Sequence, residues 1–201
     1  MILLPLTALS QVRAATQWGS ERQTPSQDQY FSGSRLNVAD MATYMLNCLY
    51  QIHVALSVYE FTDIKLETIA TQMDTHTSSL INEQVNFILQ RSGLGTIYTP
   101  IINEKGSQTP LSSVSGLDPQ AIRTSMTKFG QYLSNPDSFN MPQLELLRST
   151  RVRDSVRCGS VDIIVDVYTN IHKEVTSEKN GYENPLQLVN RTPDEVKLLL
   201  T

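Results

Sequence analysis

The sequence has few of the residues that carry enzymatic or metal chemistry. Its 201 residues include two cysteines, Cys48 and Cys158, and three histidines, His53, His76 and His172. Two widely separated cysteines provide no disulfide framework and no paired metal-ligand spacing, which favours a reducing, intracellular environment. Neither cysteine has a histidine and an orienting acid at helical spacing. We therefore predict no catalytic, cofactor-binding or metal-binding residues.

The sequence also lacks an excess of positive charge and a long apolar run. The formal net charge is −4 and the isoelectric point is about 5.4, which argues against nucleic acid as a partner. No stretch approaches the roughly 18 consecutive apolar residues of a transmembrane helix. Residues 2–9 are mostly apolar, but no basic residue precedes them and Pro5 interrupts them. This pattern favours a short amphipathic segment that packs on the protein over a signal peptide.

Glycine and proline are absent from Asp40 to Arg91, and apolar residues recur there every three or four positions. This spacing predicts two long antiparallel helices that meet near Phe61, with one bent helix as the alternative. Asp40 is the predicted N-cap of the first helix, and the pair Thr62-Asp63 caps the second. The predicted apolar stripes are Met41, Tyr44, Met45, Cys48, Leu49, Ile52, Leu56 and Tyr59 in the first helix and Leu66, Ile69, Met73, Leu80 and Phe87, widened by Ile81, Val85 and Ile88, in the second.

Glycine, proline, serine and threonine are concentrated in residues 19–35 and 105–119. We predict a linker in the first segment and a mobile loop in the second. The chain is accordingly divided into an N-terminal segment with a flexible linker, residues 1–37, and one helical domain, residues 38–201. Gly93 is expected to end the second long helix in a left-handed conformation.

Helical features continue after the second loop. Asp118 is a suitable N-cap and Pro119 suits the first helical position, while residues 141–149 suggest a short helix. The buried side of the helix after Asp118 is predicted to comprise Leu117, Ile122, Met126, Phe129 and Leu133.

The segment from Val156 to Val175 is ambiguous. A β-branched run at residues 161–167 favours a strand locally. Helical spacing, however, continues over twenty residues, beyond ordinary strand length, and no other segment is available to pair with a strand. We predict a helix, and with it an all-α array of about six amphipathic helices.

The last residues predict a short, capped helix. Thr192 is the expected N-cap, Pro193 takes the first helical position, and Glu195 completes a capping box. A helix of this length is marginal alone, so its apolar edge must dock on other helices. The glycosylation sequon at residues 190–192 is interpreted as unused, with a glycosylated secreted domain as the alternative. The apolar edge comprises Val196, Leu199 and Leu200.

One basic cluster contains Arg148, Arg151, Arg153 and Arg157. Such a cluster could bind phosphoinositide headgroups or an acidic segment. Helical geometry places only Arg153 and Arg157 together, and Asp154 dilutes the charge, so we favour a solvated surface.

Four segments carry a resemblance to a known family. They are ADMATYMLNCLYQI (39–52), VYEFTDIKLETIATQMDTHTSSLINEQVNFIL (58–89), YLSNPDS (132–138) and ENPLQLVNRTPDEVKLLL (183–200). In number and order they resemble the C-terminal region of subunit six of the conserved oligomeric Golgi complex, a vesicle tether. The resemblance covers about residues 38–201 and corresponds to the C-terminal third of family members, whereas residues 11–37 have no familiar counterpart.

The resemblance implies a helical-rod domain of the multisubunit tethering type, with no enzymatic activity. It implies a peripheral position on the cytosolic face of the Golgi membrane and a role in retrograde transport between cisternae. The implied partners are the other subunits of the complex, with Golgi SNAREs, Rab proteins or coat proteins as further partners. The alternative from the residues themselves is a small helical enzyme or ligand-binding bundle, with Cys158 or His53 at a pocket.

Overall fold

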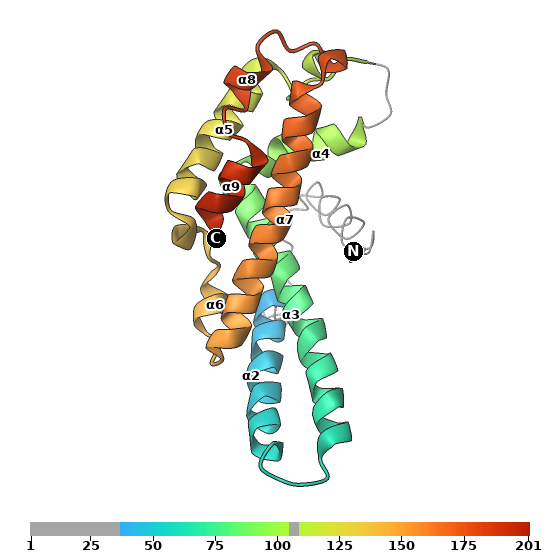
Figure 1. Cartoon of the computed structure of the whole chain (residues 1–201), viewed down its shortest axis with the longest axis vertical. Helices are drawn as coiled ribbons and strands as arrows, with labels where there is room; N and C mark the ends of the chain where they lie inside the picture. Colours follow the sequence, from blue (N-terminus) through green and yellow to red (C-terminus); the bar gives the residue numbers. More distant parts are fainter. Residues whose placement is uncertain (1–36, 105–108) are drawn as a thin grey trace, which may run out of the picture. The chain divides into compact units, whose positions relative to one another are not determined.

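The computed structural model describes residues 37–104 and 109–201, and all regular structure in these two ranges is helical (Figure 1). This confirms the all-α class. The N-terminal segment and linker predicted for residues 1–37 lie outside the described residues except for Asn37, as does the start of the predicted mobile loop. The chain separates into two compact units, Met1–Asn82 and Glu83–Thr201, with the boundary inside one long helix.

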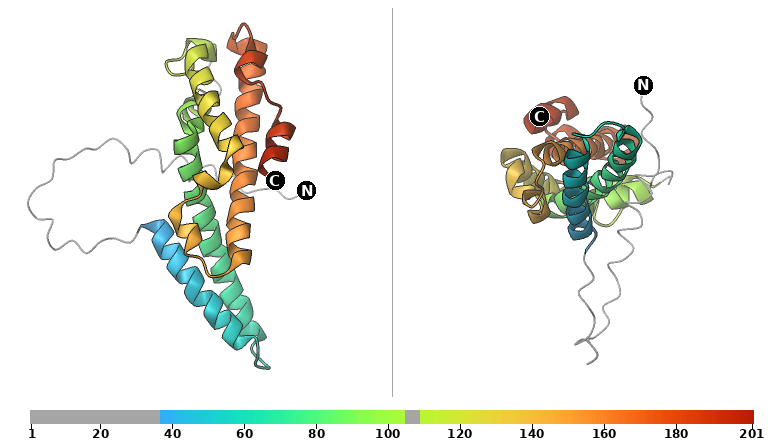
Figure 2. Two further views of the ribbon diagram at one scale, coloured as in Figure 1. Left: turned by 90° about the vertical axis from the view of Figure 1, so that its left-hand side faces the viewer. Right: turned by 90° about the horizontal axis from the view of Figure 1, so that it is seen from below.

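The described part of the first unit is a helical hairpin. Helix α2, Val38–Leu56, and helix α3, Asp63–Ser92, run antiparallel from a short turn, and residues 63–82 of α3 belong to this unit (Figures 1 and 2). Two separate helices were predicted here, and the alternative of one bent helix is excluded. Hereafter "the hairpin" denotes residues 38–82.

The start of α2 differs from the prediction. Asn37 is the N-cap, and its side-chain oxygen accepts hydrogen bonds from the amides of Ala39 at 2.7 Å and Asp40 at 3.2 Å. Asp40 lies in the first turn instead, where a carboxylate favours the positive end of the helix dipole. The helix therefore begins three residues earlier than predicted.

The buried face of α2 was also predicted incorrectly. Of the predicted stripe only Leu49 is buried, whereas Met41, Tyr44 and Ile52 are exposed. The helix carries two apolar faces, and periodicity alone favours the face with the bulkier side chains. The face that is buried instead contains small residues and comprises Ala39, Ala42, Thr43, Leu46 and Leu49.

The turn of the hairpin is organised by Thr62. Its carbonyl accepts from the Leu66 amide, but its hydroxyl donates back toward the carbonyls of Tyr59 at 2.9 Å and Leu56 at 3.1 Å. The Thr62 side chain was predicted to cap the first amides of α3. In the structure its hydroxyl closes the turn instead. Phe61 has a positive φ of 64°, the only non-glycine residue of the described chain with this conformation.

The second unit surrounds a continuous core. It contains the end of α3 and the further helices α4 (Leu94–Asn103), α5 (Pro119–Ser134), α6 (Pro142–Glu145), α7 (Thr150–Thr176), α8 (Pro185–Leu188) and α9 (Pro193–Leu200), with short 3-10 turns η1 (Leu111–Ser113), η2 (Pro136–Phe139) and η3 (Glu178–Asn180). Helices α5 and α7 both contact α4, α8 and α9. Phe129 of α5 stacks on Tyr168 of α7 with ring centroids 5.2 Å apart.

Most of the local predictions for the second unit are confirmed. Gly93 follows α3 with φ of 75°, and the carboxylate of Asp118 accepts from the amides of Gln120 and Ala121, both at 3.0 Å. The ambiguous segment is helical as α7, and residues 142–145 form α6. Helix α4 was missed, because Gly95 and Pro100 obscure a helix whose face is otherwise strongly apolar.

Helix α9 has the predicted capping box. The Glu195 amide donates to the Thr192 hydroxyl at 3.3 Å, and the Glu195 carboxylate accepts from the Thr192 amide at 2.8 Å. The apolar edge is corrected in one position. Val196 is fully buried and Leu200 is half-buried, but Leu199 is 44 % exposed, so Val196 and Leu200 anchor the helix without Leu199.

Candidate functional site: a pocket in the second unit

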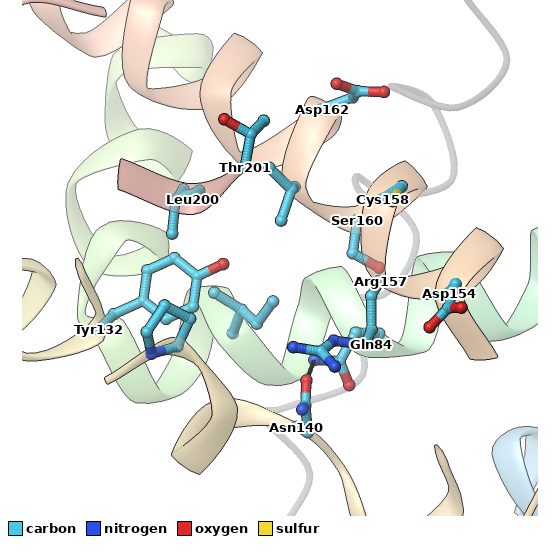
Figure 3. Close-up of a pocket in the computed structure, with 13 residues that line it drawn as sticks. Gln84, Tyr132, Asn140, Asp154, Arg157, Cys158, Ser160, Asp162, Leu200 and Thr201 are labelled. Atoms are coloured by element: carbon cyan, nitrogen blue, oxygen red, sulfur yellow. Dashed lines mark hydrogen bonds between the residues drawn. The ribbon is translucent and has the colours of Figure 1, made fainter. Parts of the chain in front are cut away.

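A pocket of about 310 Å³ lies in the second unit, with walls from the end of α3, from α5, α7 and α9, and from the segment around η2 (Figure 3). Tyr132 and Leu200 lie on one side of it, opposite Ser160 and Arg157. Its volume is at the lower limit of small-molecule sites. The pocket is therefore the candidate site for the alternative function of an enzyme or ligand-binding bundle.

The wall around η2 is fixed by Gln84, a buried glutamine of α3. Its amide nitrogen donates to the Phe139 carbonyl at 3.0 Å, and its amide oxygen accepts from the Met141 amide at 3.0 Å. The side chain thus satisfies two backbone groups of an otherwise irregular segment. Because both ends of the amide are used in this way, Gln84 has limited capacity to bind a ligand.

Arginine side chains secure the same segment from α3 and α7. Arg91 donates to the Ser138 carbonyl at 3.1 Å and lies over the rings of Phe87 and Phe139. Arg157 forms an ion pair with Asp137. These contacts hold the chain between α5 and α7 as one wall of the pocket.

The predicted arginine cluster does not act as a single group. Arg153 donates to the Leu144 carbonyl at 3.1 Å and to the Leu147 carbonyl at 2.8 Å, so its charge offsets the carbonyl end of α6. Arg157 is occupied by Asp137, while Arg148 and Arg151 are exposed elsewhere. Arg153 and Arg157 therefore bind groups of the second unit from different places on α7, and the solvated surface stays a prediction.

The pocket offers no catalytic arrangement among the residues that the structure describes. Burial raises the pKa of Tyr132 to about 12, against the smaller lowering effect of Arg157, so its hydroxyl stays protonated at neutral pH. Cys158 is exposed at the pocket, and His172 lies fourteen residues farther along α7, about 21 Å by helical rise. At that distance His172 cannot act as the general base for this thiol.

His53, the other residue named in the enzyme alternative, likewise lacks a thiol on its own helical face. Cys48 and His53 both lie on α2, five residues apart, and thus do not share one helical face. No group of three metal-ligating side chains occurs in residues 37–104 or 109–201. No described helix is long and apolar enough to cross a lipid bilayer.

Comparison with known proteins identifies the family. A family model described as "Conserved Oligomeric Golgi complex subunit 6, C-terminal" matches residues 24–200. The chain belongs to this family. Similar curated proteins, each named conserved oligomeric Golgi complex subunit 6, include those of Rattus norvegicus, 39% identical, and Homo sapiens, 36% identical, each over 170 residues that cover 85% of this chain and 26% of the relative. A more distant relative from Arabidopsis thaliana is 23% identical over 158 residues, or 78% of this chain and 23% of that protein.

The matched segment spans about a quarter of the length of these subunit 6 relatives. The family model also begins at residue 24, so the similarity extends fourteen residues farther toward the N-terminus than expected. No solved structure matches the chain.

Two of the segments that carry the resemblance to subunit 6 meet in the structure. Gln84 ends the motif LINEQ (residues 80–84) within the segment 58–89. Its partner Phe139 directly follows the motif YLSNPDS, and its partner Met141 lies two residues farther on. The sequence singled out both motifs but not the reason for their pairing. A glutamine within an apolar helical stripe was the available signal, because a buried amide requires partners.

Proposed function

We propose that this chain is part of a non-enzymatic subunit of a Golgi vesicle-tethering complex, which acts through protein–protein binding in retrograde transport between cisternae. Its partners are the other subunits of the oligomeric Golgi complex, and Golgi SNAREs, Rab proteins or coat proteins are further partners. It resides on the cytosolic face of the Golgi membrane and reaches the membrane through these partners.

The observation that carries this proposal is the family match over residues 24–200. The names of the relatives place them in a Golgi complex, and the described helices are consistent with a scaffold for binding. The alternative of a cysteine enzyme is less well supported, because His172 of the same helix lies about 21 Å from Cys158 by helical rise.

A chimera tests the proposal without depending on the length of this chain. In cells that lack subunit 6, residues 24–200 replace the matching C-terminal region of the rat relative. We expect the chimera to co-purify with the other subunits of the complex and to concentrate at the Golgi, as the intact rat protein does. The proposal fails if the chimera is stable in cells but recovers no other subunit while the rat protein does.

A matched control separates loss of binding from loss of folding. Val196→Asp in the chimera places a carboxylate at a fully buried position and should lower its abundance together with its co-purification. A chimera that is as abundant as the rat protein but is not recovered with the complex has lost binding alone.

A further inference from the structure

The hairpin leaves apolar side chains uncovered. Across residues 50–79 no side chain is buried, although this stretch includes Val58, Phe61 and Ile64, whose exposed fractions are 77 %, 97 % and 82 %. Nine of the thirteen large apolar side chains that are exposed in the described chain lie within residues 37–82. Single exposed apolar residues are ordinary, but this concentration in a short segment marks an interaction surface.

The exposed face of α2 has the spacing of a helix-binding stripe. Met41, Tyr44 and Ile52 are 44 %, 63 % and 47 % exposed; Tyr44 follows Met41 by three residues, and Ile52 lies eleven residues, about three turns, after Met41. They extend over eleven residues, about 16 Å along the helix. The opposite apolar face of α2 is already buried, and about half of the surface of each side chain on this second face remains open to solvent.

The turn of the hairpin presents an aromatic side chain at a cost in backbone energy. Phe61 is a bulky residue with a φ of 64°, where strain costs on the order of 1–3 kcal/mol, yet its side chain contributes almost no burial in return. Thr62 holds the turn closed through the carbonyls of Leu56 and Tyr59, so the ring projects from a fixed backbone. Strain without local compensation points to a role outside the hairpin.

Charge indicates the chemistry of what binds. Residues 37–82 contain five carboxylates and one lysine, a net charge of −4, whereas residues 83–201 contain thirteen carboxylates against twelve basic side chains. Glu60 directly precedes Phe61 and Asp63 lies two residues after it, and both carboxylates are exposed. Carboxylates beside exposed apolar side chains complement a basic partner and are repelled by the anionic lipids of a cytosolic membrane leaflet.

We propose that the exposed apolar side chains of the hairpin, Met41, Tyr44 and Ile52 of α2 and Val58, Tyr59 and Phe61 of the turn, bind an amphipathic helix of a partner protein whose apolar stripe is flanked by lysine or arginine. A third helix would cover the face that two helices leave open. Tyr59 and Phe61 act as anchors, since aromatic residues contribute disproportionately to interface energy. This inference rests on the proposed function, because it names a binding surface of the same scaffold.

Two synthetic peptides of about three heptads each provide the probe. Both carry the same leucine stripe, but one has lysine and the other glutamate at the flanking positions. Fluorescence anisotropy with the purified full chain should show the lysine peptide binding at least about tenfold more tightly than the glutamate peptide, with the preference reduced by added salt.

Variants of the hairpin locate the binding surface. Phe61→Ala should weaken binding of the lysine peptide by about tenfold or more. Glu60→Lys combined with Asp63→Lys should abolish or invert the preference between the peptides. The matched control is Glu183→Lys combined with Leu186→Ala, which alters an exposed charge and a 70 % exposed leucine of the second unit and should change neither affinity.

Several results would overturn the inference. Equal affinity for the two peptides, no binding of either, or unchanged binding after both hairpin substitutions would each do so. A doubled mass in light scattering that Phe61→Ala returns to the monomer value would assign the surface to a second copy of this chain. Flotation with phosphatidylserine vesicles that depends on Phe61 would assign it to a membrane. If the chimera joins the complex while the peptides fail, this inference falls and the proposed function stands.

Discussion

The two units of this chain are built from similar amphipathic helices but expose them differently. In residues 83–201 the helices share a core, and Phe129 is 2 % exposed between α5 and α7. In the described part of the first unit Phe61 is 97 % exposed at a strained turn. A hairpin of two helices has a single internal interface, whereas several helices around α7 enclose their apolar faces on more than one side. The same residue type is therefore a core element in one unit and a surface element in the other.

The largest expected effect is a difference in the free energy of unfolding between alanine variants of these two phenylalanines. Phe129→Ala should lower the free energy of unfolding by about 3–5 kcal/mol, because it removes a buried ring and leaves a cavity. Phe61→Ala should change it by less than about 0.5 kcal/mol, because nothing in the hairpin packs on the ring. Urea denaturation followed by circular dichroism measures both. Comparable losses for the two variants would show that the units are not packed differently.

Aspartate substitutions should also differ in their stability cost between the two units, by nearly as much. Val196→Asp buries a charge on α9 and should cost about 3 kcal/mol or more. Ile64→Asp should be near neutral, since Ile64 is 82 % exposed and lies in the first turn of α3, where a negative charge is favourable. Leu199→Asp should lie between them, because Leu199 is 44 % exposed. Melting temperatures that fall equally for all three would contradict the burial of α9.

A glutamine pair on α3 tests the same contrast within one helix. Gln84→Ala leaves the Phe139 carbonyl and the Met141 amide buried without their partner and should cost roughly 2–3 kcal/mol. Gln72→Ala, at an exposed position of the hairpin, should cost less than about 0.5 kcal/mol. Denaturant midpoints give both values. Gln84 would have no structural role if the two variants were equally stable.

Buried tyrosines should make the second unit sensitive to alkaline pH. Burial raises the pKa of Tyr132, Tyr168 and Tyr182 to about 12, from the ordinary value of 10.0. Since the unfolded chain releases these protons first, their contribution to stability is complete below pH 10 and is lost as pH rises toward about 12. Denaturant midpoints measured over this interval should fall, and less steeply for Tyr168→Phe. Tyr59→Phe, at a 66 % exposed position, is the control and should leave the slope unchanged.

The smallest expected effect is an increase in the stability of the hairpin. Phe61→Gly should stabilise the hairpin by roughly 0.5 kcal/mol, because glycine relieves the positive-φ strain but costs conformational entropy in the unfolded chain. Phe61→Ala retains the strain and should show no such gain. Amide hydrogen exchange across the turn reports the difference. A destabilised glycine variant would indicate that the phenylalanine supports the hairpin rather than an external partner.

Local signals in the sequence were sufficient for much of the fold. The helix at Asp118 and the capping box at Thr192 depend on side chains within three residues of the amides they bind, so short-range pattern defines them. Length likewise decided that residues 150–176 form a helix despite their β-branched run. Helix α4 escaped detection, because glycine and proline are local breakers whose cost is offset there by four buried apolar side chains.

The candidate surfaces could not be predicted in the same way. The spacing of Met41, Tyr44 and Ile52 indicated an apolar stripe, but not whether another helix covers it, since α2 has a second apolar face. The pairing of Gln84 with Phe139 joins residues 55 positions apart. No pattern within a single helix contains that information.

The sequence by itself determined the helical class, most helix ends, the family and the scarcity of catalytic side chains, because these depend on neighbouring residues or on composition. The tertiary structure alone decided which apolar faces are buried, which arginines are occupied and where a strained aromatic side chain is presented. Burial and hydrogen bonding in the second unit depend on segments brought together from distant positions, and only packing selects among faces that are equally apolar in the sequence.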